Sequence, residues 1–219
     1  GREFESPQPH ERNRKGRCEQ IILLASGLYI MIPYQERPRE IEDATRFLRS
    51  GTQTPITPEI QKIAAEFQGK ALEKIKQIIS FLKKLKNTRF DADVFRKRTA
   101  TQIITDNYVT GCTDSALVFV TLARASGLPT KYVETIDRKW LEKGRGSIGG
   151  HIYGQVYDAK EDRWIWVDPM NRRVDIPAPT ERVVYKEGLD SWDIGITDFD
   201  SLKILFEVFR SEWAEKHKK

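Results

Sequence analysis

Apolar residues spaced three and four positions apart predict a helical segment over residues 57–85. Thr57 suits the position that caps a helix, and Pro58 suits the first turn. Gly69 interrupts the segment, so we expect the helix to break or bend there. The same spacing predicts a last helix from Asp200 to about Lys216, with its apolar face formed by Leu202, Leu205, Phe206, Phe209 and Trp213.

A further apolar run follows Cys112 and ends at Gly127-Leu128-Pro129, which predicts a helix with Cys112 in or just before its first turn. Beyond it, alternating apolar and polar residues predict strands. These strands cover residues 131–136, 151–157, 163–167, 173–176 and 182–185. Helices followed by an antiparallel sheet describe an α+β fold.

The amino-terminal part differs from the rest. Residues 1–45 read as a basic arm with an accessory element, and residues 46–219 as the main domain, because a chain of 219 residues suits one core of ordinary size. An apolar run at 21–32 follows the basic segment 12–17 and resembles the core of a signal peptide, but no clear cleavage site follows it. We expect an ordered element there, with an export or membrane-anchor remnant as the alternative. No apolar run is long enough to predict a transmembrane helix.

Composition narrows the possible partners. Hydrophobic residues make up 39% and charged residues 32% of the chain, as is typical of a globular protein. The net charge is +5 and the pI about 9.1. The basic clusters are scattered and the aromatic residues follow core patterns, so we expect no nucleic-acid partner and at most a weak preference for acidic surfaces or substrates.

Cysteine and histidine are scarce. Cys18 and Cys112 are the two cysteines, and a disulfide between them would leave Cys112 without a free thiol. The chain has no Cys-x-x-Cys and no His-Glu-x-x-His motif, so we predict no metal site and no cofactor. A free-thiol protein fits the reducing cytoplasm, and export is the alternative.

Three short segments carry candidate chemistry. Cys112 lies at the mouth of a predicted helix, where unpaired amides and the helix dipole favour a thiolate. His151 follows Gly150, and Asp168 precedes Pro169. Together they offer a nucleophile, a base and a carboxylate to orient the base.

The second and third segments form a predicted β-hairpin. Pairing Tyr157 with Asp162 leaves residues 158–161 as a four-residue loop, a common length. His151 then faces Asp168 directly on one face of the sheet, and Tyr153 faces Trp166 beside them. A slip of one residue would separate His151 from Asp168, so the inference depends on the loop.

These motifs resemble those of the transglutaminase-like superfamily of papain-fold cysteine enzymes. The resemblance spans roughly residues 47 to 185, and the matching segments are Pro58–Leu85, Arg98–Ala100, Gly111–Ala116, Arg124–Pro129, Gly150-His151 and Trp166–Pro169. Three motifs in the right order are more specific than any one of them. The resemblance implies a papain-like core, with residues 46–219 as the catalytic domain. It also implies Cys112 as nucleophile, His151 as general base and acid, and Asp168 as orienting carboxylate.

The resemblance further implies an oxyanion site built from the Cys112 backbone amide and one upstream side chain. Gln102, Asn107 and Tyr108 are the candidates. We expect Trp166, Tyr153 and Gly150 to border the substrate cleft. The basic, glycine-rich residues 138–150 are either a solvated loop or a flap that faces the substrate.

The expected reaction is attack of the Cys112 thiolate on a peptide or carboxamide carbonyl, with a thioester intermediate. Water as acceptor makes the protein a cysteine protease or amidase, which we prefer. A lysine amine as acceptor makes it a protein-glutamine crosslinking transglutaminase. A non-catalytic binding domain of the same fold is the third hypothesis.

Overall fold

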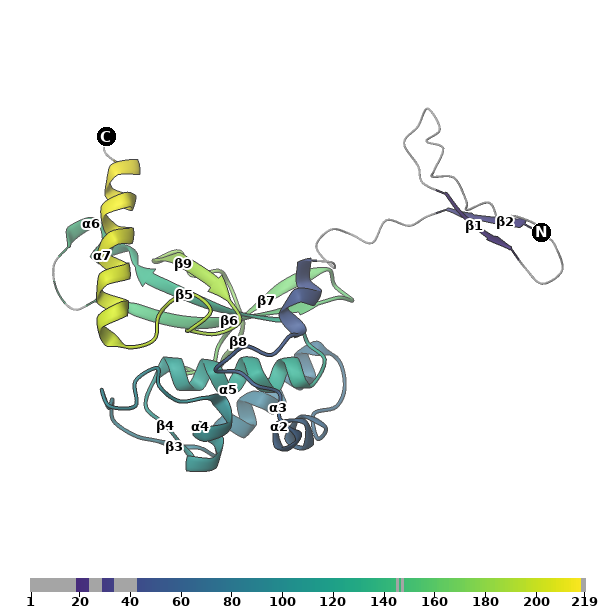
Figure 1. The fold of residues 1–219 in the computed structure, drawn as a ribbon, viewed down its shortest axis with the longest axis horizontal. Helices are drawn as coiled ribbons and strands as arrows, with labels where there is room; N and C mark the ends of the chain where they lie inside the picture. Colours follow the sequence, from purple (N-terminus) through teal and green to yellow (C-terminus); the bar gives the residue numbers. More distant parts are fainter. Residues whose placement is uncertain (1–18, 24–28, 34–42, 145, 147, 218–219) are drawn as a thin grey trace, which may run out of the picture. The chain divides into compact units, whose positions relative to one another are not determined.

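A computed structural model describes residues 19–23, 29–33, 43–144, 146 and 148–217. The chain divides into two compact units, Gly1–Glu42 and Asp43–Lys219 (Figure 1). In the first unit β1 (Glu19–Leu23) pairs with β2 (Tyr29–Pro33) in antiparallel fashion. The two strands take up both ends of the apolar run 21–32. The basic segment 12–17, Cys18 and residues 34–42 lie outside the described residues.

The second unit has helices first and the main sheet afterwards, which confirms the predicted α+β class. Its helices are η1 (Arg46–Leu48), α2 (Pro58–Ala64), α3 (Ala71–Leu82), α4 (Ala100–Asp106), α5 (Cys112–Ala125), α6 (Arg138–Lys143) and α7 (Phe199–Lys216). Its strands are β3 (Lys86–Asn87), β4 (Tyr108–Val109), β5 (Thr130–Asp137), β6 (Gly150–Asp158), β7 (Arg163–Asp168), β8 (Arg173–Ile176) and β9 (Arg182–Gly188).

The predicted helix at 57–85 is two helices. Thr57 caps α2 by accepting a hydrogen bond from the amide of Ile60 at 3.3 Å, and Pro58 takes the first position. Gly69 adopts a left-handed backbone with φ of +100°, which a residue with a Cβ adopts only with strain. The Glu73 side chain then accepts a hydrogen bond from the Lys70 amide at 2.8 Å and starts α3.

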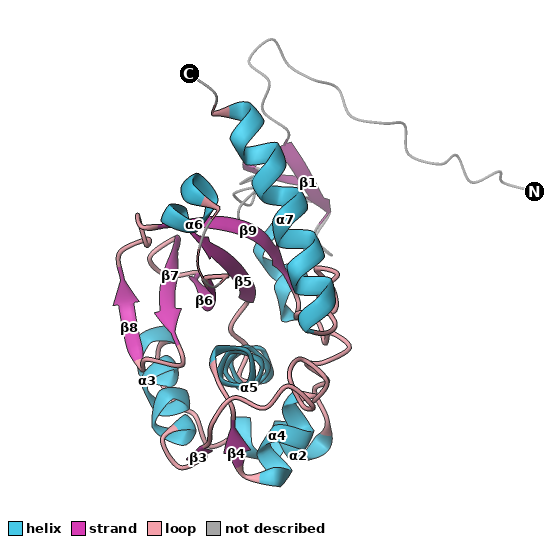
Figure 2. Ribbon diagram, turned by 90° about the vertical axis from the view of Figure 1, so that its left-hand side faces the viewer, coloured by secondary structure: helices cyan, strands magenta, loops and turns pink. Residues whose placement is uncertain are grey.

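The main sheet has the strand order β8-β7-β6-β5-β9, with every neighbouring pair antiparallel. Helix α5 lies between this sheet and helices α2, α3 and α4 (Figure 2). Every residue from Thr113 to Arg124 is buried, so α5 is the centre of the core. Ile152 and Val167 pack in the same core. This arrangement fixes the first residue of α5 against the rest of the unit.

Residues 138–150 are only partly a loop. Their first half forms α6, which the sequence analysis did not predict. Asp137 caps α6 through the Trp140 amide at 3.0 Å, and Gly144 ends it in a left-handed conformation. Trp140 and Leu141 are buried, so this half is part of the core and the expectation of a loop or flap was wrong for it.

Helix α7 confirms the predicted last helix. Leu202 and Phe206 are buried, while Leu205, Phe209 and Trp213 are only partly buried against the core. Among the described residues, no helix combines the length and hydrophobicity needed to cross a membrane.

A buried arginine joins distant parts of the chain. The guanidinium of Arg96 donates to both carboxylate oxygens of Glu134 at 2.9 and 3.0 Å, and to the Ser191 hydroxyl at 2.5 Å. The backbone oxygen of Arg96 accepts bonds from the side chains of Gln53 at 2.8 Å and Trp192 at 2.7 Å. The segment before α4 is therefore bound at once to β5, to the segment before α2 and to the loop before α7.

Candidate active site

Cys112 is the first residue of α5 and a free, half-buried thiol. The turn before it is fixed by Asp114, whose carboxylate accepts bonds from the Thr110 amide at 2.9 Å and the Thr110 hydroxyl at 2.8 Å. Arg98 donates to the same oxygen at 2.5 Å. A Cβ built on Gly111 would meet no atom within 4 Å, so the backbone beside the thiol borders open space. The sulfur is held in place and can be approached.

His151 lies near the start of β6 and contacts Asp168 directly. Its Nε2 is 2.9 Å from Oδ2 of Asp168, and the Cys112 side chain is close enough to help raise the pKa of the ring. Because Nε2 faces the carboxylate, Nδ1 is the ring nitrogen left for the thiol. His151 and Asp168 are buried, with 9% and 3% of their surface exposed, so water screens their interaction weakly.

Burial and hydrogen bonding oppose each other at His151. Burial alone would lower its pKa, but the interactions with Asp168 and Cys112 outweigh that effect and raise the pKa to about 9. At Asp168, burial alone would raise the pKa, yet the bonds from His151 and Asn171 hold it below its ordinary range. These interactions favour a protonated imidazole beside an ionised Asp168 at neutral pH.

The hairpin register differs from the predicted one. Tyr157 pairs with Trp164 rather than Asp162, so each partner is displaced by two residues. The loop is 159–162, because Asp162 takes a left-handed conformation with φ of +48° and accepts a hydrogen bond from the Tyr157 hydroxyl. A displacement of two keeps every side chain on its predicted face. His151 and Asp168 therefore still meet, as diagonal neighbours instead of directly opposed ones.

Asn171 is a site residue that the sequence analysis missed. Its backbone nitrogen and its side-chain Nδ2 both donate to the Asp168 carboxylate, at 3.1 and 2.8 Å. The signal was the turn sequence Asp168-Pro169-Met170-Asn171, in which asparagine and proline are typical. Asn171 fixes the carboxylate that in turn fixes the imidazole.

We predict that Asn171→Ala lowers kcat/KM about tenfold, because a hydrogen bond to a charged group contributes about 1.5–3 kcal/mol. Steady-state kinetics on an activated ester would measure the loss, and the exposed neighbour variant Met170→Ala is the control. An unchanged kcat/KM in Asn171→Ala would mean that Asp168 does not need this support.

The three predicted oxyanion residues lie in different settings. Gln102 is exposed, and its Oε1 accepts the Thr99 amide at 2.8 Å as part of the cap of α4. Asn107 is an exposed, left-handed residue that ends the same helix. Tyr108 is half-buried beneath the Arg98 guanidinium, 4.1 Å from the ring centre. Tyr108 is thus the candidate that packs against the side chains fixing the cysteine turn.

The predicted cleft residues divide between the two faces of the sheet. The Tyr153 ring lies 4.8 Å from the His151 ring and 5.6 Å from the Trp166 ring, centre to centre. Gly150 faces the other way: a Cβ there would meet Phe206 at 3.3 Å and Glu134 at 3.5 Å. Gly150 therefore serves close packing against α7 and β5, and Tyr153 and Trp166 accompany the histidine.

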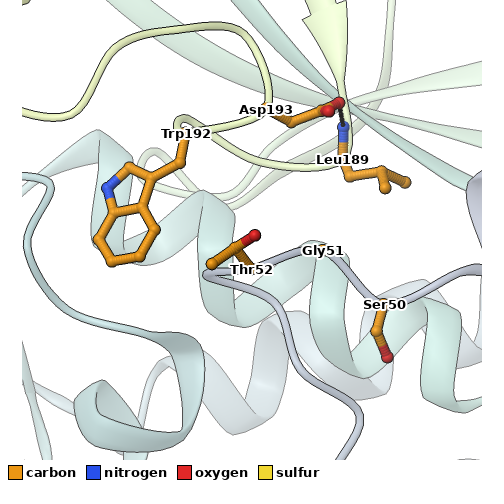
Figure 3. A pocket seen from close by; sticks show the side chains of 6 residues that line it. All are labelled: Ser50, Gly51, Thr52, Leu189, Trp192 and Asp193. Atoms are coloured by element: carbon orange, nitrogen blue, oxygen red, sulfur yellow. Dashed lines mark hydrogen bonds between the residues drawn. The ribbon is translucent and has the colours of Figure 1, made fainter.

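A hollow of about 370 Å³ lies between residues 50–52 and the loop after β9 (Figure 3). Asp193 accepts the Leu189 amide there at 2.8 Å, and Trp192 forms part of the lining. No thiol or imidazole lines it, so it is not the candidate active site. Within the described part of the chain, no three histidine, cysteine or acidic side chains are grouped as a metal site.

The comparisons with known proteins agree with the fold. The structure resembles that of a candidate cysteine protease from Cytophaga hutchinsonii, with a TM-score of 0.53 and 20% identity over 70% of this chain. This chain spans 50% of the length of that protein. LapG of Legionella pneumophila matches 68% of this chain at 15% identity, with a TM-score of 0.43, and covers 94% of its own length. No curated protein sequence matches.

The model of the transglutaminase-like superfamily matches residues 61–169, about half of the chain. The match begins in α2 and ends just after Asp168, so it takes in the cysteine helix, β6 and β7. The chain belongs to the transglutaminase-like superfamily.

Proposed function

We propose that this protein is a thiol-dependent acyl transferase that hydrolyses peptide or carboxamide bonds, a cysteine protease or amidase. One observation carries the proposal: a buried histidine bonds to a fixed carboxylate at 2.9 Å, and a cysteine at a helix start is among the groups that raise the pKa of that histidine. A nucleophile, its base and an orienting group within hydrogen-bond reach form the arrangement that covalent catalysis requires.

In the proposed mechanism the Cys112 thiol gives its proton to Nδ1 of His151. The thiolate attacks the substrate carbonyl, and the backbone amide of Cys112 at the start of α5 stabilises the oxyanion. Tyr108 is the proposed second donor. His151 then protonates the departing amine, a thioester forms, and water activated by His151 hydrolyses it and regenerates the thiol.

Two observations favour catalysis over a binding role of the same fold. The pKa of His151 is raised to about 9, so the imidazolium that pairs with a thiolate is the stable form at neutral pH. The space beside Gly111 is open, which lets a substrate backbone reach the thiol.

The alkylation rate of Cys112 by iodoacetamide, followed from pH 5 to 9, tests the proposal. An ordinary thiol with a pKa of about 8.5 loses reactivity about tenfold per pH unit below that value. We expect the wild-type rate at pH 6 to stay within a few-fold of the rate at pH 8. In His151→Ala the alkylation rate at pH 6 should be about 100-fold lower than the rate at pH 8. The exposed variant His217→Ala should behave as wild type.

Equal titration of the wild type and His151→Ala, both like a free thiol, would contradict the catalytic proposal and leave a binding domain. Peptide mapping of the alkylated protein would assign the label to Cys112 rather than Cys18.

A further inference from the structure

A second hollow, of about 280 Å³, adjoins the candidate active site. Its lining is Tyr153, Arg173, Ile176 and residues 177–181. Small-molecule sites usually measure about 300–1,000 Å³, so this one suits a single side chain better than a whole ligand. It borders Tyr153, whose ring contacts His151, and it has no part in the proposed mechanism.

Tyr153 forms the wall between the hollow and His151. The two residues lie two positions apart on β6 and therefore on the same face. Their rings meet edge to face at 81°, a favourable geometry for aromatic side chains. A substrate group in the hollow is thus separated from the imidazole by one ring.

The far wall is a short connection. β8 and β9 are the two edge strands of the sheet, so residues 177–181 connect opposite edges. Pro177 and Pro179 each fix one backbone dihedral angle within this connection.

Hydrogen bonds fasten the end of the same segment. The Arg138 amide donates to the Glu181 carbonyl at 3.0 Å, and the Arg138 side chain to the Thr180 carbonyl at 3.2 Å. Arg182 donates to the Gly149 carbonyl at 3.0 Å. The hollow therefore has a fixed wall rather than a loose loop, and a preformed site binds at low entropic cost.

The chemistry of the walls selects the occupant. The Tyr153 ring, Ile176, Pro177 and Pro179 supply apolar surface, and the remaining wall carries the polar side chains of Arg173, Thr180 and Glu181, the charges of the first and last being opposite in sign. In the proposed mechanism His151 protonates the leaving amine, so that half of the substrate lies on the histidine side of the scissile bond. The hollow lies on that side as well.

We propose that this hollow binds the apolar side chain of the residue on the amine side of the scissile bond. This inference rests on the proposed function. In the reverse of acylation an amine attacks the thioester. The same pocket then determines which amine binds. The amine nitrogen forms the C–N bond, the C–S bond breaks, and the amine proton passes through His151 to the departing thiolate.

Partition of the acyl-enzyme tests the proposal. The protein is mixed with N-acetylglycine p-nitrophenyl ester, and the burst of nitrophenolate counts the acyl-enzyme formed. Leucinamide or glycinamide is added, and chromatography measures the ratio of amide to acid product. One apolar side chain in a fitted pocket is worth about 10–200-fold in selectivity. We expect leucinamide to be preferred at least tenfold over glycinamide, a ratio that does not depend on the amount of active enzyme.

Two variants and a matched control locate the preference. Ala178→Glu places a carboxylate in the exposed wall, and Ile176→Ser removes an apolar lining group. Both should reduce the preference to within threefold, and the amide-to-acid ratio reports this whatever the size of the burst. Val208→Glu adds the same charge at an exposed position of α7 and should keep the wild-type preference.

A burst followed by equal partition would overturn this inference and leave the proposed function standing. Retention of the preference in Ala178→Glu and Ile176→Ser would also overturn it, because the amine would then bind elsewhere. Absence of a burst in the wild type would overturn the proposed function and this inference together.

Discussion

Alanine at Cys112 or at His151 is expected to reduce acyl transfer about 10⁴ to 10⁶-fold, and the double variant is expected to lose no more than either single one. The reason is that the thiol and the imidazole act as a unit. Without His151 the thiol has no partner for its proton, and without Cys112 no atom forms the thioester. Independent contributions would instead multiply in the double variant.

Nitrophenolate release from the activated ester measures this loss in all three variants. His217→Ala is the control, since His217 is exposed just after the end of α7 and its ring stacks on Trp213. Thermal unfolding shows whether each variant remains folded. Residual activity within tenfold of wild type in folded Cys112→Ala would contradict the assignment of the nucleophile.

Replacement of Asp168 by alanine is expected to cost about 10³ to 10⁴-fold in kcat/KM. The carboxylate bonds to Nε2 and so leaves Nδ1 to face the thiol. Asp168→Asn should retain more activity, because an amide oxygen still accepts a bond from Nε2 and orients the ring without the negative charge.

The pH dependence of the reaction rate is a second measurement on Asp168→Ala. The bond to Asp168 helps to hold the pKa of His151 at about 9, so the imidazolium keeps its proton to higher pH than usual. Without the carboxylate the pKa falls, and the alkaline limb of the rate profile should move to lower pH. Asp175→Ala, which removes an aspartate paired with Arg163 on the sheet surface, is the matched control and should not move it. An unmoved limb in Asp168→Ala would show that His151 is not the titrating group.

Sequence patterns predicted the elements that build the candidate site because each has a strong local signal. Thr57, Pro58 and Gly69 mark helix ends through their own backbone preferences. Burial of one sheet face fixed which side chains share a face, so His151 and Asp168 meet despite an error of two residues in register. The error arose because two four-residue loops fit the same hairpin, and only the left-handed Asp162 distinguishes them.

Other features depended on tertiary packing or on overlooked caps. Nothing local shows that Trp140 and Leu141 are buried, although Asp137 and Gly144 are helix-end residues. Thr99 followed by Gln102 is the pattern of a capping box, which accounts for the Gln102 side chain. The partners of Arg96 are far away in the sequence, so no short pattern could find them.

The Arg96 contacts bear on the order in which the chain completes its fold during synthesis. Cys112, His151 and Asp168 are all translated before Ser191 and Trp192, which bind Arg96, and before α7. Until those later residues emerge, the Arg96 charge lacks part of its buried environment, and the segment before α4 is not bound to the loop before α7. Because domains fold as units during synthesis, a nascent chain that ends at Asp168 is expected to remain incompletely folded.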